Sequence, residues 1–301
     1  MTKYILMVFA GACSFGILST FVKLAYREGY TAAGISVTQA FTGMLVLWLC
    51  VWLKRKQQKT QSAIPIANSW PVLITGAAIG LTTFVYYVSV KYIPASVAII
   101  LLMQFTWMGV LLDRIIFNKK ADAIQLITIA IILAGTLLAS GMTRLQVDGA
   151  FIKGMLYALA SAFLYAIYVV ANSRIGIAIP ALEKSAIIMT GSTIGIAVVN
   201  FHQLTVGHHF DMGLIKWTLF LALFGTIIPP VLFAQGIPRI GAGISAIIMT
   251  AELPVAVICA SIVLDERIAP LQWTGIVIML LAIVWMNIHV HFRSRLTARS
   301  T

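Results

Sequence analysis

A single carboxylate, Glu252, lies near the middle of the apolar stretch Ala242–Leu264, and Pro254 follows two residues later. A helix that rises about 1.5 Å per residue would carry this stretch across a hydrocarbon core of about 30 Å. Glu252 would then lie near the membrane midplane, where an ion costs at least about 2.5 kcal/mol. We interpret it as a proton site or a cation-substrate site in a central cavity. The alternative is a structural carboxyl, protonated or hydrogen-bonded to backbone that Pro254 frees.

Other apolar stretches contain aromatic and amide side chains that suit a cavity for organic solutes. Helix packing is the alternative interpretation for each of them. The candidates for solute binding beside Glu252 are Gln104, Trp107, Tyr86, Tyr87, Tyr165, Tyr168 and Gln235.

Two adjacent prolines, Pro229 and Pro230, fall in the middle of a further apolar stretch. Proline lacks a backbone N–H and disfavours helical geometry in the residue before it. We therefore predict helix breaks at Pro229, Pro230 and Pro254, with free carbonyls lining a cavity. A simple kink that shapes packing is the alternative for the paired prolines.

Motifs for catalysis or for a tightly bound metal are missing from the sequence. It has no Gly-x-Ser-x-Gly, no His-Glu-x-x-His and no P-loop lysine motif. Cys13, Cys50 and Cys259 all lie inside apolar runs, which predicts small packing residues. The pair His208-His209 is interpreted as a solvated turn. We expect no enzyme, no cofactor and no metal site.

The composition indicates a protein that spans a membrane many times. Of its 301 residues, 60% are hydrophobic and 10% are charged, against about 25% charged residues in soluble domains. We predict an all-α membrane protein of ten transmembrane helices. The predicted spans are Tyr4–Ala25, Ala32–Leu53, Pro71–Val90, Ala95–Leu112, Ala123–Met142, Phe151–Ala171, Ser185–Phe201, Leu214–Gln235, Ala242–Leu264 and Pro270–Val290.

The positions of Lys and Arg predict the orientation, because cytoplasmic loops carry an excess of them. With the N-terminus inside, 14 of the 21 basic residues fall on the inner side and 7 on the outer side. Both termini are therefore expected in the cytoplasm, in a multi-pass protein of the cell membrane. The net charge of +12 is explained by this topology and by lipid headgroups, so we expect no nucleic-acid partner.

The two halves of the chain resemble each other. When Ala95–Ser140 is shifted by 147 positions, Ala95 falls on Ala242 and Gln125 falls on Gln272. Each half then holds five spans, an odd number, so the second half must enter the membrane upside down. We predict two inverted five-helix repeats, residues 1–146 and 147–301. Inverted repeats are typical of secondary transporters, whose site lies near the midplane between the halves.

The second half also resembles a known family. Its pattern of Glu252-x-Pro254-Val255, Leu264-Asp265-Glu266, Gln272 and Gly275 is similar to that of EamA-type members of the drug/metabolite transporter superfamily. In the first half Gln125 is kept, whereas Lys119, Thr128 and Trp107 stand where the second half has Glu266, Gly275 and Pro254. The resemblance covers essentially the whole chain and implies ten helices in two repeats. It also implies export of amino acids, metabolites or drugs.

Together these features predict a secondary transporter of small organic solutes, working outward by alternating access and coupled to protons through Glu252. An exchanger of phosphorylated or nucleotide-linked metabolites is an alternative, but it needs cavity cations, and Lys23, Lys91 and Arg239 lie at span edges. An intramembrane lipid-modifying enzyme would need several reactive groups at one depth, where Glu252 is alone. The expected partners are the solute, the lipid bilayer and protons; whether the protein forms a homo-oligomer is left open.

Overall fold

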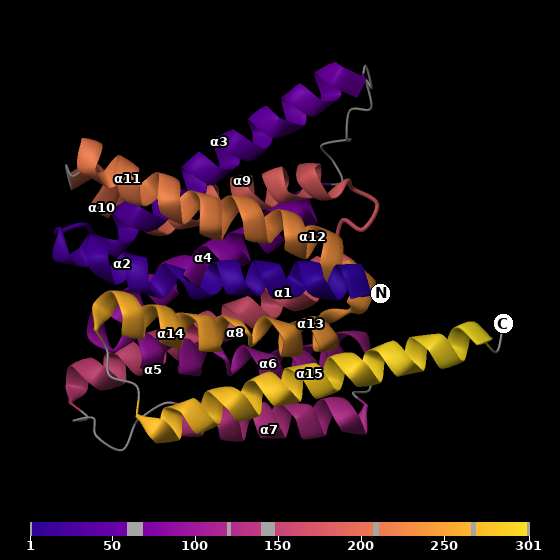
Figure 1. Ribbon diagram of the computed structural model, residues 1–301. Coiled ribbons are helices and arrows are strands. Elements are labelled where there is room, and N and C mark those ends of the chain that lie inside the picture. The colour runs from indigo at the N-terminus through magenta and orange to yellow at the C-terminus, as the bar shows by residue number, and fades with distance from the viewer. Residues whose placement is uncertain are drawn as a thin grey trace.

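The computed structural model describes residues 2–58, 69–118, 122–139, 148–206, 211–265 and 269–299, and these ranges are helical apart from short turns (Figure 1). A helix satisfies its own backbone hydrogen bonds, which is what a chain in hydrocarbon requires. Lys119, Glu266 and the pair His208-His209 lie outside the described residues, so their predicted roles stay predictions. The helices are α1 (Thr2–Gly16), α2 (Leu18–Arg27), α3 (Ala32–Gln58), α4 (Trp70–Tyr92), α5 (Ala95–Leu102), α6 (Phe105–Phe117), α7 (Ala123–Ala139), α8 (Gly149–Arg174), α9 (Ala181–Val199), α10 (Phe201–Val206), α11 (Met212–Leu221), the π-helix η3 (Ala222–Ile227), α12 (Ile228–Ile240), α13 (Ala242–Met249), α14 (Glu252–Leu264) and α15 (Pro270–Arg299).

Across the described residues, eight helical segments are long and apolar enough to cross a membrane. Four of them are bent spans made of consecutive pieces: α1 with α2, α5 with α6, α11 with η3 and α12, and α13 with α14. Two shorter apolar helices, Ala123–Ala139 and Pro270–Met286, account for the remaining predicted spans. The predicted class, an all-helical membrane protein, is confirmed.

The internal repeat is visible in the bent spans. The first span breaks at Met103 and Gln104 between α5 and α6, and the second breaks at Thr250 and Ala251 between α13 and α14. These positions differ by the same 147 residues that relate the two sequences. The spans also end alike, because the residue after α6 and the residue after α14 are both left-handed (Asn118, φ 52°; Asp265, φ 56°).

The repeats run in opposite senses. α5 packs beside α14, and α6 packs beside α13, so these two spans are antiparallel (Figure 1). α7 and α15, the last helices of the two halves, also lie against each other. Because the halves are inverted, α1 begins and α15 ends at the same end of the bundle (Figure 1). We call this the terminal end and the opposite one the distal end.

Close backbone contact between α4 and α9 joins the halves at the centre. A Cβ atom on Gly76 would overlap the carbonyl of Ile188, and one on Gly191 would overlap the carbonyl of Leu73. Glycine at both positions lets the two helix backbones touch, as small residues do in membrane bundles. The largest fully buried side chains include the aromatic residues Tyr87 on α4, Tyr168 on α8 and Phe105 on α6.

Candidate functional site

The break between α13 and α14 positions Glu252. Pro254 has no N–H to donate to the carbonyl of Thr250, four residues earlier. That carbonyl instead accepts from the N–H of Leu253 at 3.1 Å, and the Thr250 hydroxyl donates back to the carbonyl of Ile247 at 2.7 Å. The tightened turn makes Glu252 the first residue of α14. The matching break between α5 and α6 has the same bond, from the N–H of Thr106 to the carbonyl of Met103 at 3.1 Å, without a proline, so the role of Pro254 stays a prediction.

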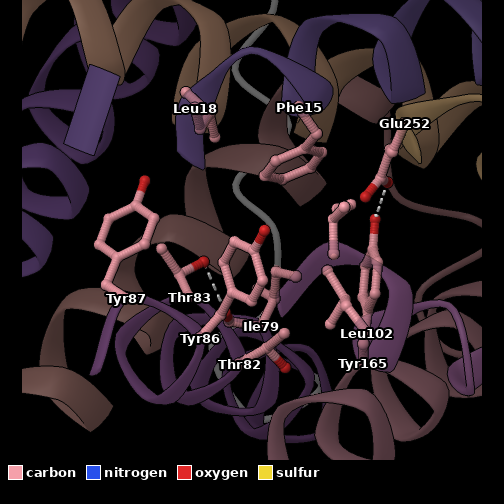
Figure 2. A pocket seen from close by; sticks show the side chains of 11 residues that line it. Phe15, Leu18, Ile79, Thr82, Thr83, Tyr86, Tyr87, Leu102, Tyr165 and Glu252 are labelled. Atoms are coloured by element: carbon pink, nitrogen blue, oxygen red, sulfur yellow. Dashed lines mark hydrogen bonds between the residues drawn. The ribbon is translucent and has the colours of Figure 1, made fainter. Parts of the chain in front are cut away.

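Glu252 lies inside the protein and has a phenol as its hydrogen-bond partner. Its side chain is 2% exposed, and the hydroxyl of Tyr165 on α8 donates to its Oε1 atom at 2.5 Å (Figure 2). The ring of Tyr165 is held in turn by Phe105, with ring centroids 4.6 Å apart, and by Tyr168 in a stacked arrangement at 6.2 Å. A carboxyl bonded to a phenol rather than to a cation can gain or lose a proton without breaking an ion pair.

Glu252 and Tyr165 line a small cavity between the two halves (Figure 2). The space open to the centre of a water molecule is about 30 Å³, enough for one or two waters and too small for an organic solute. The wall is mostly apolar, with hydroxyl groups from one face of α4. The lining residues are Phe15, Leu18, Ile79, Thr82, Thr83, Tyr86, Tyr87, Ile99, Leu102, Tyr165 and Glu252.

The face of α4 supplies most of the polar atoms of this cavity. Its lining residues recur every three or four positions, from Ile79 through Thr82 and Thr83 to Tyr86 and Tyr87. Tyr86 is buried, with 6% of its surface exposed. Even so, its hydroxyl has no hydrogen-bond partner of normal geometry among the described residues. A buried donor without a partner is costly unless a water or ligand satisfies it. The helical spacing of these polar residues is a signal that the sequence contained.

Three of the predicted binding residues lie elsewhere. Gln104 and Trp107 bond to each other at 2.9 Å, and Trp107 is 39% exposed on the outside of the bundle. Gln235 on α12 is also absent from the lining of the cavity. The side chain of α12 that packs on the lining residue Phe15 is the buried Phe233. Contrary to prediction, these three side chains do not share the cavity with Glu252. For Gln104 and Trp107, the repeat alignment predicts the same depth as Glu252 but not the direction in which the side chains point.

The paired prolines produce a π-helical turn rather than an open break. Pro229 and Pro230 begin α12, directly after η3. In π-helical register the carbonyl of Phe224 would accept from residue 229, which as proline has no N–H. The hydroxyl of Ser14 on α1 donates to this carbonyl at 2.6 Å. The freed backbone group is thus satisfied by a neighbouring helix and does not line the cavity.

The two ends of the bundle differ. At the terminal end two ion pairs join the halves: Arg174 on α8 with Asp113 on α6, and Arg55 on α3 with Glu183 on α9, each at 3.2 Å. At the distal end the bundle instead opens into a vestibule, in which the space open to the centre of a water molecule is about 950 Å³.

Two tyrosines separate the vestibule from the cavity. Tyr26 lines the vestibule, Tyr87 lines the cavity, and the hydroxyl of Tyr26 donates to the carbonyl of Tyr87 at 2.7 Å. The Tyr87 hydroxyl donates to Gln39 at 2.9 Å. The first of these bonds joins a residue of the vestibule lining to the backbone of a residue of the cavity lining, so the two spaces adjoin at this contact.

The sequence matches one family model twice, over residues 2–141 and 152–288, and that model describes the EamA-like transporter family. The chain belongs to the EamA-like transporter family. The membership predicted from the pattern around Glu252 and Gln272 is confirmed, as is the expectation that the protein is not an enzyme. The two matched regions agree with a chain built from two repeats.

Relatives of this EamA-like protein align along most of its length. It is 23% identical to a protein of Bacillus subtilis (strain 168) described as uncharacterized transporter YcbK, over 88% of this chain and 86% of that protein. It is also 23% identical to uncharacterized transporter YwfM of the same organism, over 93% and 92%. A solved crystal structure superposes with a TM-score of 0.70 at 15% identity, covering 95% of this chain and 98% of that one, which supports the fold.

Metal coordination has no support in the described part of the chain, where no three His, Cys, Asp or Glu side chains gather as ligands. The chemistry of this EamA-like site therefore rests on one carboxyl, one phenol bonded to it, and the hydroxyls of α4.

Proposed function

We propose that the protein moves small organic solutes outward across the cell membrane by alternating access, with a proton carried on Glu252. The observation that carries this proposal is a carboxyl group 2% exposed, bonded to Tyr165, in a cavity between two inverted repeats. In such a low-dielectric place the neutral carboxyl is favoured, and ionisation requires water or a charged solute.

The unequal ends of the bundle support alternating access. Ion pairs between the halves hold the terminal end together, and a vestibule reaches in from the distal end as far as Tyr26. Rocking of one repeat against the other would break the ion pairs, open the terminal end and close the vestibule. The cavity at Glu252 would widen during this exchange to admit the solute.

The outward direction rests on the resemblance to exporters of the superfamily. Exchange of phosphorylated metabolites is the less favoured function, because the residues that line the cavity among those described include no Lys or Arg. A phosphate group there would lack the cations that usually bind it.

A metabolite profile tests the proposal. Cells that overexpress the wild-type protein should release at least one class of small organic solute faster than cells that express an equal amount of Glu252→Gln. Gln keeps the shape of the side chain and can still accept from Tyr165, but it cannot titrate. Equal profiles for wild type, the variant and empty-vector cells, with both proteins folded in the membrane, would contradict the proposal.

A further inference from the structure

The vestibule at the distal end concentrates positive charge around a space large enough for an organic molecule. Three basic residues line it: Lys23 and Arg27 on α2 and Lys91 on α4. A fourth, Lys153, lies outside the lining with its Nζ atom 5.3 Å from the ring centroid of Tyr92, which does line it. No carboxylate is among the described residues that line this space.

This clustering runs against the general distribution of charge in the chain. The positive-inside pattern places only 7 of the 21 basic residues at the distal end, and four of these surround one vestibule. Basic side chains at a membrane surface often reach toward lipid headgroups. The side chains of Lys23, Arg27 and Lys91 line one concave space at the distal end of the bundle, where their fields add. Those of Arg27 and Lys91 are also exposed.

Two acidic side chains lie beside the vestibule and accept hydrogen bonds from neutral groups, one of which belongs to the lining residue Tyr30. Glu28 accepts from the indole N–H of Trp217 at 2.7 Å, and Asp211 accepts from the hydroxyl of Tyr30 at 2.7 Å. The hydrogen bond to Asp211 raises the pKa of Tyr30 to about 12, so this phenol stays neutral and does not offset the cations with a charge of its own.

Aromatic rings complete the lining. Tyr26, Tyr30, Tyr92 and Tyr157 surround the vestibule, and Tyr92 and Tyr157 are stacked with ring centroids 6.2 Å apart. Phenol rings offer an apolar face and a polar tip, which suits an organic body attached to a charged group. A site lined by cations alone would bind inorganic anions as well as organic ones. The added aromatic rings favour anions that carry an organic body.

From this lining we infer that the vestibule is a binding site for organic carboxylates, and that monocarboxylic acids with an aromatic or apolar body are substrates. The inference rests on the proposed transport function and names its substrate class. The next space along the path contains Glu252 and no lining cation. A monocarboxylate can enter that space neutralised by one proton, whereas a phosphate dianion would need two.

Direct binding tests the inference on the full-length protein in lipid nanodiscs. The probes are benzoate, phenyl phosphate and the neutral benzyl alcohol, measured by equilibrium dialysis at low and high salt. Wild type should bind benzoate and phenyl phosphate, which are both anions, more tightly than benzyl alcohol, and high salt should weaken that binding because it screens charge. Replacing Lys23, Arg27 and Lys91 with Gln should weaken it at least tenfold, about the value of one charged hydrogen bond.

Lys216→Gln is the matched control, because Lys216 is an exposed lysine at the same end of the bundle that does not line the vestibule. It should leave the benzoate affinity unchanged. Equal loss in the control and the triple variant, or wild-type affinity in a folded triple variant, would overturn the inference. Equal affinity of wild type for benzoate and benzyl alcohol would overturn the requirement for a charged group.

Transport separates this inference from the proposed function. If wild type exports amines or neutral solutes but not carboxylates, the substrate class is wrong and the transport function stands. If it moves no solute of any class although benzoate binds, the transport function is wrong and the binding site stands.

Discussion

Glu252 and Tyr165 form a contact whose energetic value can be measured. Tyr165→Phe keeps the ring against Phe105 but removes the donor from a buried carboxyl. We expect it to lower the free energy of unfolding by about 1–3 kcal/mol, the usual cost of a buried polar group that loses its partner. Glu252→Gln should cost less, because an amide oxygen still accepts from the phenol.

Tyr168→Phe is the control for this loss, since Tyr168 lies one turn further along α8 and is equally buried. Its hydroxyl accepts a longer bond from Asn172, at 3.3 Å. Thermal unfolding in detergent, followed by intrinsic fluorescence, gives the comparison. If Tyr165→Phe is no more destabilising than Tyr168→Phe, the hydrogen bond to Glu252 contributes little.

At the residue scale, the sequence predicted depth better than direction. A lone charge in an apolar run is conspicuous, so Glu252 could be found without a structure, and Tyr86 and Tyr165 followed as amphipathic groups. Gln104 and Trp107 are predicted at the same depth, but Trp107 is exposed and the half-buried Gln104 is bonded to it, because the direction of a side chain depends on which neighbours pack beside the helix. The hydroxyls of Thr82 and Thr83 were missed, although their spacing with Tyr86 and Tyr87 marks one helical face.

At the scale of the helices, the contact between α4 and α9 leaves the least space for a larger side chain. Gly191→Ala would place a methyl group against the backbone of Leu73, which cannot move aside as a side chain can. We expect a loss of about 1–3 kcal/mol in the free energy of unfolding, as for other overpacked sites. Gly149→Ala is the control, because a Cβ atom there meets no atom within 4 Å.

The melting temperatures of the two variants test this contact. Gly191→Ala should melt several degrees below wild type, and Gly149→Ala should melt close to it. Equal melting temperatures for both variants and wild type would mean that the helices separate at little cost and that the close approach is not required.

The spans themselves were predictable, because about twenty apolar residues between polar turns have few alternatives in a bilayer. The breaks inside the spans were harder to predict. The break before Phe105 has no proline to mark it, and Pro229 and Pro230 yield a π-helical turn whose free carbonyl is bonded by Ser14. Such outcomes depend on the neighbouring helix, which the sequence of one span does not contain.

For the whole molecule, the odd number of spans in each repeat predicts inversion, and the antiparallel pairing of α5–α6 with α13–α14 agrees with it. The side of the membrane that each end faces is a prediction from the excess of Lys and Arg. If both termini face the cytoplasm, the vestibule with Lys23, Arg27 and Lys91 faces the outside. A carboxylate that leaves the cavity would then meet these cations last.

The central claim is that protonation of Glu252 couples solute movement to a proton gradient. Proteoliposomes loaded with a solute found in the metabolite profile can be diluted into buffer with or without a pH difference across the membrane. In wild type, net flux should change with the gradient. In Glu252→Gln, folded and still able to bind the solute, flux should no longer respond to it. The same gradient response in Glu252→Gln as in wild type would contradict the account.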